Sequence, residues 1–512
     1  MDALIPLFIV IPLISAFLIM LLGKLVKGFH RYFAPLILLA LLLMALIAFL
    51  NLGGSSIQYA VGGWGLEKGI PVGIFMVLDS FSVLMLCIIN LLGFIALFYS
   101  FSYIAKYTAE SNYYSLFCLI IAGMNGVVLS GDLFNLCVFL EVSVIASYAL
   151  VAFGVGKTEL EASYKYQILG SVGFMLILLA VGMIYWLTKT LNIADVRHVL
   201  AAGYNKPYYI FVQVLLIAGF GLKAAIIPFH AWLPDAHSSA PSPISAMLSG
   251  VLIKAVGIYV IIRLFFNMFV FSQEIAIVLT SLGAISMVLG SLLAIVQWDL
   301  KRLLAYSSIS QIGYVVMAFG MGILLLLKGN NEAAAILAIG GGIYHMINHA
   351  VFKGLLFLNA GAIEHRLDTR KMKEMGGLST VMPITSTTSF MGSMSISGIP
   401  PFNGFFSKLI IIIAAINGRF YLLASLAVLV SIITLAYFLK FQRFAFFNKT
   451  AGKAISKIRE VPFPMSFSMI FLATLCLALS LLAFPSVSES ILRPAIDALL
   501  QSELYSTSII GI

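Results

Sequence analysis

The chain has 512 residues, of which 62% are hydrophobic and only 10% are charged. Soluble domains average roughly 25% charged residues, so this composition excludes a soluble enzyme and also disordered, coiled-coil and collagen-like chains. The formal net charge of +10 is typical of basic cytoplasmic loops in a membrane protein, and we expect no nucleic-acid partner. The sequence therefore predicts an all-α polytopic protein in the lipid bilayer.

Apolar runs long enough to cross a bilayer recur along the whole chain. A spanning helix needs about 20 apolar residues. The first run follows Met1-Asp2-Ala3 without a basic segment or a cleavage site, which predicts a retained helix rather than a signal peptide. We predict about fourteen transmembrane helices, at residues 3–23, 32–52, 77–102, 112–130, 133–154, 162–187, 208–230, 241–262, 275–297, 303–326, 333–362, 380–418, 421–439 and 463–485.

Two of these runs contain helix breakers. Prolines between residues 228 and 243 interrupt the apolar stretch after Lys223, and residues 380–418 contain Ser-Gly-Ile-Pro-Pro at 397–401. A break at membrane depth persists only where protein or a water-filled cavity satisfies the freed backbone groups. A pair of broken helices in two halves of a chain therefore points to a transport site.

A faint internal repeat accompanies the two breaks. Asp132-Leu133 opens one predicted span and Asp299-Leu300 opens another. Each unit would contain about five helices, and an odd number inverts the second unit in the membrane. We therefore divide the chain into an N-terminal three-helix segment (1–110), a first five-helix repeat (111–267), a second five-helix repeat (268–420) and C-terminal helices (421–512).

Lysine and arginine are distributed unequally between the predicted loops. If the N-terminus is outside, the cytoplasmic loops, which include Lys301 and Arg302, carry about twice as many basic residues as the opposite loops, to which we assign Arg263. The positive-inside rule then predicts that both termini are outside. We expect a multi-pass protein of a prokaryotic plasma membrane.

Charged side chains within the predicted spans are the main functional signal. A Lys or Glu at the bilayer centre costs about 2.5–3.5 kcal/mol, so such a group must pair, contact water or face the interior. Glu141, in mid-span, is either half of a structural ion pair or a titratable relay member. Two of the lysines, Lys165 and Lys353, lie nearer span ends, where they could instead snorkel. The lysines within spans are Lys165, Lys223, Lys254, Lys353 and Lys408.

The histidines add further candidates. His345 and His349 are four residues apart and so share one helix face; a proton relay, plain packing with hydrogen bonding, and metal or haem ligation all remain open. His230, beside the first break, is a relay candidate. Asp235 and His237 follow at a predicted cytoplasmic mouth, where they either cap and fix the loop or admit ions.

No cofactor motif is visible. Val155-Gly-Lys-Thr158 resembles the end of a phosphate-binding loop, but Val151 stands where glycine is needed and no strand precedes it. The cysteines form no CxxC pair. We expect no catalytic residue, no metal ligand and no cofactor, so energy must come from an ion gradient or a neighbouring subunit. An oxidoreductase complex could still contain this chain as a non-redox component.

Four long motifs resemble one known family. They run from Lys223 to Ala246, from Asp299 to Tyr314, from His345 to Leu355 and from Ser397 to Lys408. In this order, over roughly residues 110–420, they are similar to the proton-conducting antiporter-like family. That family includes the antiporter-like subunits of respiratory complex I, the D-type subunits of Mrp cation/proton antiporters and homologous subunits of membrane-bound hydrogenases.

The resemblance implies fourteen transmembrane helices in two inverted five-helix repeats, with the seventh and twelfth helices broken, and a buried polar axis along the membrane plane. The chain ends soon after its last predicted span, as in the shorter D-type or hydrogenase-type subunits. By motif, Glu141 and Lys223 correspond to the family's Glu–Lys pair, and Lys254 corresponds to its central lysine. His345 and His349 correspond to the central-axis histidines. Lys408 corresponds to the terminal exit residue, where some relatives carry Glu.

We therefore expect a proton-translocating, antiporter-like subunit that works with other membrane subunits of an Mrp-type or hydrogenase/complex I-like assembly. The sequence does not decide between these two assemblies, or whether Na⁺ moves together with H⁺. Two other classes stay open: a quinone- or haem-binding redox membrane subunit, and a stand-alone secondary transporter. The redox interpretation predicts a bound chromophore or quinone, and the stand-alone interpretation predicts activity without partners.

Overall fold

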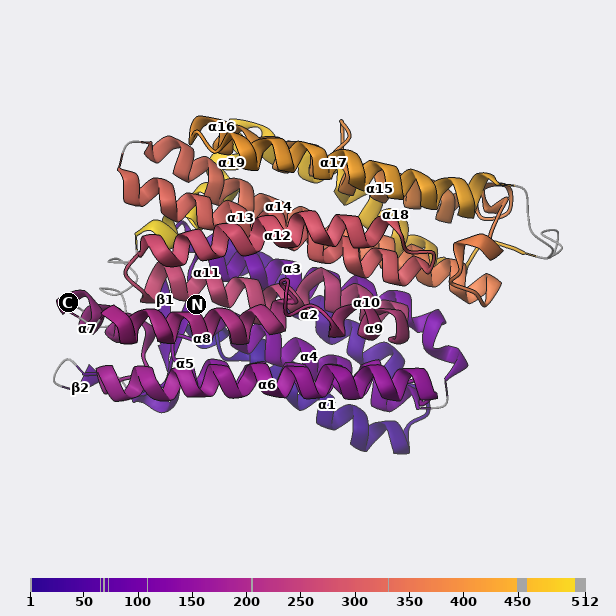
Figure 1. Ribbon diagram of the computed structural model, residues 1–512. Coiled ribbons are helices and arrows are strands. Elements are labelled where there is room, and N and C mark those ends of the chain that lie inside the picture. Colours follow the sequence, from indigo (N-terminus) through magenta and orange to yellow (C-terminus); the bar gives the residue numbers. More distant parts are fainter. Residues whose placement is uncertain are drawn as a thin grey trace.

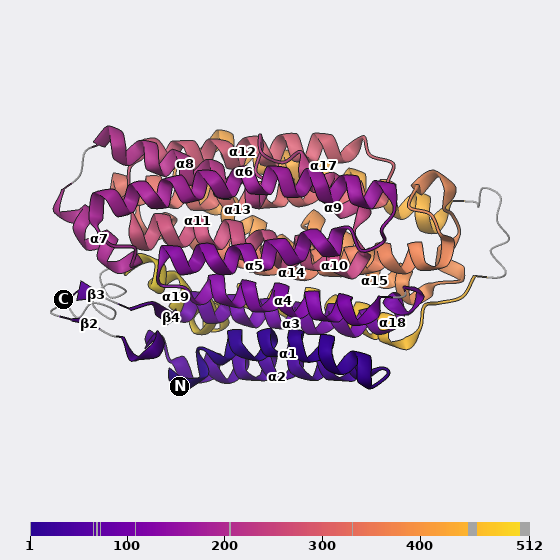
Figure 2. The ribbon, with the colours of Figure 1, turned by 90° about the horizontal axis from the view of Figure 1, so that it is seen from below.

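A computed structural model describes residues 2–64, 66–67, 70–71, 73–107, 109–203, 206–329, 331–448 and 458–501. Within these residues, thirteen helices are long and apolar enough to cross a membrane. They lie side by side in one bundle, with their axes roughly parallel to one another (Figures 1 and 2). The predicted all-α polytopic fold is confirmed.

The first half of the bundle follows the predicted spans closely. Asp79 begins α3 with a capping box, in which its carboxylate accepts from the Ser82 N–H, and Asp132 caps α5 in the same manner through Asn135. The helices here are α1 (Leu7–Leu25), α2 (Phe29–Leu52), α3 (Ser80–Tyr103), α4 (Glu110–Leu129), α5 (Leu133–Val151), α6 (Lys157–Thr188), α7 (Ile193–Ala202), α8 (Lys206–Ala224), α9 (Trp232–Ser239), α10 (Ser242–Met247) and α11 (Tyr259–Arg263).

The second half contains the long predicted run at 380–418, which is two consecutive helices, α15 and α16, as the helix breakers predict. Neither is long enough to count among the thirteen spans. The helices here are α12 (Gln273–Ile295), α13 (Leu300–Lys328), α14 (Glu332–Leu367), α15 (Pro383–Ser397), α16 (Asn403–Asn417), α17 (Tyr421–Gln442), α18 (Phe463–Ala478) and α19 (Pro485–Leu500).

The starts of α5 and α13 share one local structure. Asp132 forms an isolated antiparallel bridge with Asn192, and Asp299 forms one with Lys371. In both places the residue after the aspartate donates its N–H to the far segment: Leu133 to the Leu191 carbonyl and Leu300 to the Arg370 carbonyl, each at 2.9 Å. This matches the Asp132/Asp299 repeat in the sequence, while the domain boundaries themselves stay a prediction.

The centre of the bundle is one buried helical stretch, Ser242–Met268, which no lipid-facing residue interrupts. Within it, two π-helical segments, Leu248–Leu252 and Lys254–Ile258, join α10 to α11, and a third, Leu264–Met268, follows α11. π-Helical turns bond each N–H to a carbonyl five residues back and often occur at functional sites. The stretch packs against α14, α3 and α8, so a side chain on it is remote from lipid.

Short strands between α2 and α3 depart from the all-α prediction. β1 (Ile57–Ala60) pairs antiparallel with β4 (Phe75–Leu78), and β2 (Leu66–Glu67) pairs with β3 (Ile70–Pro71). The apolar residues of β1 and β4 suit strands because they include β-branched and aromatic side chains. The segments are too short to cross a bilayer, so they leave the membrane fold unchanged.

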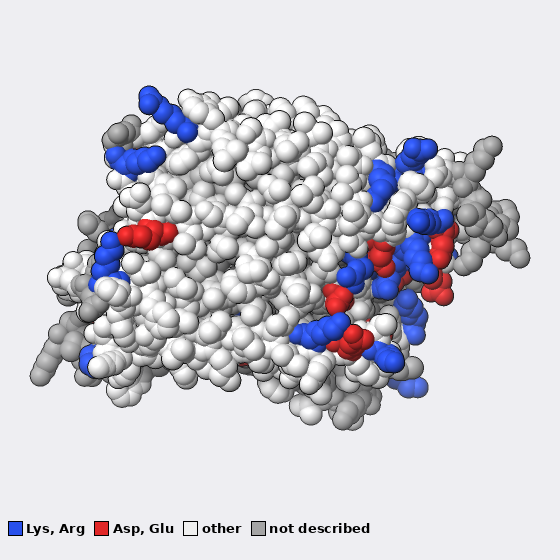
Figure 3. All heavy atoms as spheres, in the orientation of Figure 1, with Lys and Arg blue, Asp and Glu red and all other residues white. Residues whose placement is uncertain are grey.

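On the face shown in Figure 3, charged residues lie mainly at the ends of the helices and not along their middle. Figure 3 shows an uncharged belt between the ends of the helices, with Lys, Arg, Asp and Glu gathered mainly at one end. This charged end comprises the starts of α6 and α13 and the end of α14, where ion pairs join Lys165 to Asp235 and Arg370 to Asp299. A belt of this kind is what lipid contact requires.

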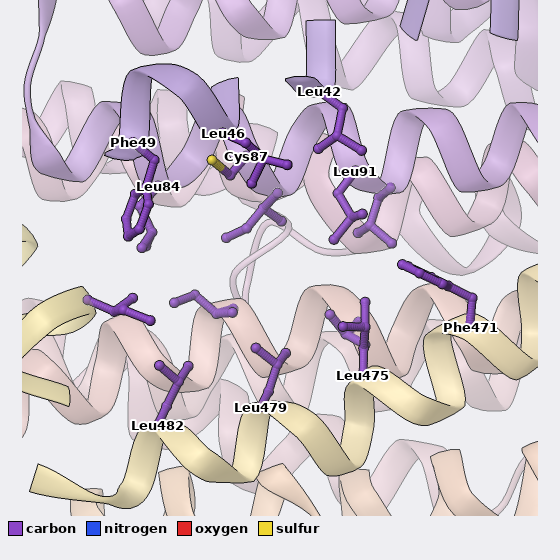
Figure 4. A pocket seen from close by; sticks show the side chains of 15 residues that line it. Leu42, Leu46, Phe49, Leu84, Cys87, Leu91, Phe471, Leu475, Leu479 and Leu482 are labelled. Atoms are coloured by element: carbon purple, nitrogen blue, oxygen red, sulfur yellow. The ribbon is translucent and has the colours of Figure 1, made fainter. Parts of the chain in front are cut away.

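An apolar cavity of about 400 Å³ opens between α2 and the C-terminal helices, over α3 and α14 (Figure 4). Leucine side chains such as Leu42, Leu91 and Leu475 line it, and the sulfur of Cys87 is its most polar side-chain atom. Apart from this thiol, the described lining residues offer no charged or hydrogen-bonding side chain.

Glycines bring α12 and α13 into backbone contact. A Cβ on Gly313 would collide with the Met287 backbone N, and one on Gly283 would collide with that of Met317. Gly313→Val is therefore expected to force the helices apart and to lower the yield of folded protein severely, since overpacking costs about 1–3 kcal/mol or more. The measurement is the detergent-extracted, monodisperse fraction. Gly182→Val is the control, because nothing lies within 4 Å of that Cβ; equal yields would contradict the prediction.

Candidate functional site

Glu141 of α5 and Lys223 in the last turn of α8 form an ion pair, with 3.0 Å between Oε1 and Nζ. The two partners differ in accessibility: the Lys223 side chain is 1% exposed and that of Glu141 is 22% exposed. Glu141 also lines an otherwise apolar cavity of about 700 Å³, which opens laterally beside Leu13, Phe134 and Phe174. The pair therefore joins the protein interior to the side of the bundle.

The first break follows directly after Lys223. α8 ends at Ala224, and Ala225 has a φ of 55°. The freed backbone groups find protein partners: the Ile227 N–H donates to Ser286 Oγ at 3.0 Å, and the Trp232 indole donates to the Leu222 carbonyl at 2.9 Å. These contacts meet the requirement that irregular backbone at membrane depth be satisfied by protein.

Lys254 lies on the central buried stretch and is 1% exposed. Its ammonium donates to the carbonyls of Ser249 (2.6 Å) and Gly250 (2.5 Å), both within the first π-helical segment. The salt bridges found among the described residues do not include Lys254. A lysine held only by neutral carbonyls bears most of the desolvation penalty of its charge.

Lys353 of α14 is 0% exposed, so the prediction that it could snorkel is wrong. The predicted span ended at 362, but α14 continues to Leu367, which places Lys353 deeper in the bundle. Its ammonium donates to the Leu304 carbonyl at 2.7 Å and to the Ser307 hydroxyl. Lys353 is therefore a buried lysine of the bundle interior, like Lys254.

Two serine hydroxyls and two backbone carbonyls lie between Lys353 and Lys254. Ser308 Oγ donates to the same Leu304 carbonyl at 2.9 Å and lies 2.7 Å from Ser249 Oγ. Ser249 in turn supplies a carbonyl to Lys254. A chain of polar groups thus runs between two buried lysines on different helices.

His345 and His349 lie on one face of α14, and both are 0% exposed. His345 Nδ1 is 3.0 Å from the Ser407 hydroxyl. Among the described residues, His345 Nε2 and both ring nitrogens of His349 have no hydrogen-bond partner. Three His, Cys, Asp or Glu side chains that could hold a metal ion do not come together anywhere in the described part of the chain.

Lys408 follows the second break, on α16, and is 2% exposed. Its ammonium donates to the Ile396 carbonyl at 2.7 Å and lies 5.0 Å from the centre of the Tyr314 ring. That ring is also 5.5 Å from the His345 ring. The break thus brings Lys408 close to His345, with the Tyr314 ring in contact with both side chains.

An amide pair fixes the second break to α14. Asn348 Nδ2 donates to the Asn403 carbonyl, and Asn403 Nδ2 donates to Asn348 Oδ1, both at 2.9 Å. Ser395 at the end of α15 also donates to the Asn403 side chain. Because Asn348 lies between His345 and His349, this clamp sets the position of the histidines relative to Lys408.

The remaining accessory candidates gather at the charged end. Lys165 is 47% exposed and pairs with Glu161 and Asp235. Its ammonium therefore reaches the surface, and Lys165 is not one of the buried lysines. Burial alone would raise the pKa of Asp235, but hydrogen bonds from Arg302 and Lys165 outweigh it and lower the pKa. His230 is partly exposed, with its ring 6.4 Å from that of Tyr306.

Two buried ion pairs were missed by sequence reasoning. Arg263 and Lys301, both assigned to loops, are 4% and 2% exposed and pair with Asp79 and Glu364. Arg263 has apolar neighbours on both sides in the sequence and lies just past the predicted end of its span at 262, which is the signal that could have found it. No local pattern identifies its partner, since the two residues are far apart in sequence.

Spanning helices, two breaks and a row of buried basic residues define a polytopic membrane protein that keeps ionisable groups inside the bilayer. Such groups mark ion and proton pathways. The row consists of the buried residues Lys223, Lys254, Lys353, His349, His345 and Lys408, together with the partly exposed Glu141 that pairs with Lys223.

Comparison with known proteins places this class more narrowly. Residues 130–434 match the family model described as NADH:quinone oxidoreductase/Mrp antiporter, transmembrane. The chain is 32% identical over 518 residues to the D-type subunit of the Na⁺/H⁺ antiporter of Alkalihalophilus pseudofirmus, covering 100% of both chains. It is 33% identical over 463 residues to the N-type subunit of the NADH-quinone oxidoreductase of Desulforudis audaxviator, covering 89% of each.

Comparison with solved structures supports the same family as the sequence comparison. A chain of the Mrp complex from Dietzia sp. DQ12-45-1b superposes with a TM-score of 0.87 at 26% identity, covering 100% of this chain and 99% of that one. A chain of the membrane-bound sulfane sulfur reductase, an archaeal respiratory membrane complex, also gives 0.87, at 28% identity and 99% coverage of both. The chain belongs to the NADH:quinone oxidoreductase/Mrp antiporter transmembrane family.

Proposed function

We propose that this chain is a proton-translocating, antiporter-like subunit of a multisubunit membrane complex. The observation that carries the proposal is the row of buried basic residues, linked in part by hydroxyl groups and ended laterally by the Glu141–Lys223 pair. A Lys or Glu inside a bilayer is expensive, and a single structural ion pair would not require five further buried basic groups.

Protons would move along the row by successive exchange between neighbouring groups. When Glu141 is ionised, it favours the ammonium form of Lys223. A change at the lateral surface that weakens this pair favours release of a proton from Lys223 toward Lys254 and the histidines. Lys408, beside the second break, would exchange protons with one side of the membrane.

The drive for this cycle would come from neighbouring subunits. The relatives include one component of an Na⁺/H⁺ antiporter and one of an NADH-quinone oxidoreductase, so an ion gradient and electron transfer are both suitable sources. By the positive-inside rule, the charged end would face the cytoplasm and both termini would be outside. Co-purifying subunits, identified after gentle extraction, would distinguish the two sources.

Lys223→Ala tests the proposal in the assembled complex. We expect proton translocation to fall by at least about 100-fold, because proton transfer through a positioned group typically contributes that much. The complex is reconstituted in liposomes with an entrapped pH-sensitive dye and is energised by an Na⁺ gradient or by its electron donor, whichever drives the wild type. Lys165→Ala is the control, since that lysine is exposed. A Lys223→Ala complex that translocates protons at the wild-type rate would contradict the proposal.

A further inference from the structure

A second buried Glu–Lys pair lies at the charged end, apart from the row. Lys301 in the first turn of α13 places its Nζ 2.7 Å from Oε2 of Glu364, near the end of α14. The Lys301 side chain is 2% exposed and that of Glu364 is 21% exposed. Tyr103 (3.4 Å) and Ser242 (3.3 Å) also donate to this carboxylate. Glu364 is therefore held in place while part of it stays open to the charged end.

One face of α14 connects this pair to the row. Lys353, Phe357 and Glu364 are spaced at i, i+4 and i+11, so they lie along a single stripe about 16 Å long. The Lys353 ammonium is 6.0 Å from the centre of the Phe357 ring. On the same stripe, Gly361 lacks the Cβ that would collide with Ser242, which lets α10 approach.

His237 of α9 lies beside this stripe. Its ring centre is 4.9 Å from that of Phe357, the ring that Lys353 also contacts. Lys301 donates to the Ala240 carbonyl at 3.1 Å, at the end of α9, and so is anchored three residues from His237. Burial, together with the positive charges of Lys353, Lys301 and Lys254, lowers the pKa of the ring to about 3, so the ring is neutral at rest. His237 therefore lies between the second ion pair and the row.

Hydrogen bonding within the described residues does not account for a histidine at position 237. It is 0% exposed, and neither ring nitrogen has a hydrogen-bond partner among the described residues. A buried polar group without a partner destabilises a fold, so a histidine kept only for packing would be better replaced by an apolar ring. An imidazole can, however, accept a proton at one ring nitrogen and release one from the other.

We propose that Glu364, Lys301 and His237 form a proton inlet that connects the charged end of the bundle to Lys353. The inlet rests on the proposed function, since it has a role only if the row conducts protons. A hydronium ion at the charged end protonates the Glu364 carboxylate and leaves a water molecule, while the Lys301 ammonium gives a proton to His237 and regains one from Glu364. His237 then protonates neutral Lys353. Only N–H and O–H bonds change, and one proton leaves His237 for each that enters at Glu364.

His237→Phe is the primary test, because phenylalanine fills the same site beside Phe357 without unpartnered polar atoms. The assembled complex is expected to form in wild-type amounts and to translocate protons at least about 100-fold more slowly. A packing role predicts no change in rate, and that result would overturn the inlet.

Glu364→Gln provides a second, independent readout. We expect slow translocation that formate, a small weak acid, restores in part by delivering protons at the accessible Glu364 position. The matched control is Glu374→Gln, which removes a 51% exposed carboxylate at the same end and is expected to leave the rate unchanged. A loss of assembly with no rescue by formate would identify Glu364 as a structural anchor and contradict the inlet.

Lys223→Ala, measured in parallel, separates failure of the inlet from failure of the proposed function. If Lys223→Ala is inactive while His237→Phe and Glu364→Gln both translocate at the wild-type rate, the inlet is wrong and the row stands. If all three variants translocate normally, the proposed function itself fails.

Discussion

Lys254→Met is expected to abolish proton translocation while leaving the complex at least as stable as the wild type. Lys254 is 1% exposed, and its ammonium donates to two backbone carbonyls, those of Ser249 and Gly250. Burying a charge costs several kcal/mol unless its partners are excellent, and methionine fills similar space without that cost. The proton translocation rate should therefore fall, while the stability of the complex stays level or rises.

The measurement pairs translocation in liposomes with the unfolding temperature of the detergent-purified complex. We expect translocation to fall at least about 100-fold and the unfolding temperature to stay level or rise. Lys440→Met is the matched control, because that lysine also donates to two carbonyls, those of Ile295 (2.5 Å) and Gln297 (2.7 Å), but lies outside the row. A Lys254→Met complex that still translocates at the wild-type rate would remove Lys254 from the pathway.

The spans and most of the row could be predicted because lipid imposes strong local rules. A helix in a bilayer must be long and apolar, so a charged residue inside such a run stands out. Glu141, Lys223, Lys254 and Lys408 are visible in this way. The pairing of Glu141 with Lys223, 82 residues apart, came from the family resemblance and not from any local pattern.

What the sequence did not reveal depends on contacts between helices. Lys301 follows a helix cap at Asp299 and looks like an ordinary loop lysine, yet the end of α14 folds over it and supplies Glu364. Lys165 has the opposite outcome, since the first turns of α6 extend beyond the predicted span and expose it. Both differences follow from helix ends, which hydropathy locates least well.

The Asp79–Arg263 pair is expected to stabilise the fold without conducting protons. Two guanidinium nitrogens of Arg263 donate to the two Asp79 oxygens at 2.6 and 2.8 Å, and both side chains are 4% exposed. The Tyr259 hydroxyl and the Asn267 amide oxygen accept further guanidinium hydrogens. A guanidinium keeps its proton at any physiological pH, so this pair can hold charge in place but cannot relay it.

Arg263→Met is therefore expected to lower stability by about 3–5 kcal/mol, because it leaves the Asp79 carboxylate buried without its counter-ion. Adding Asp79→Asn should restore most of this loss, since asparagine is neutral and still caps α3 through Ser82. The readouts are the unfolding temperature and the translocation rate per assembled complex, which should stay near the wild-type rate in the double variant. A stable double variant without translocation would place this pair in the pathway, and the distinction between a fixed guanidinium pair and an exchangeable Glu–Lys pair would then be wrong.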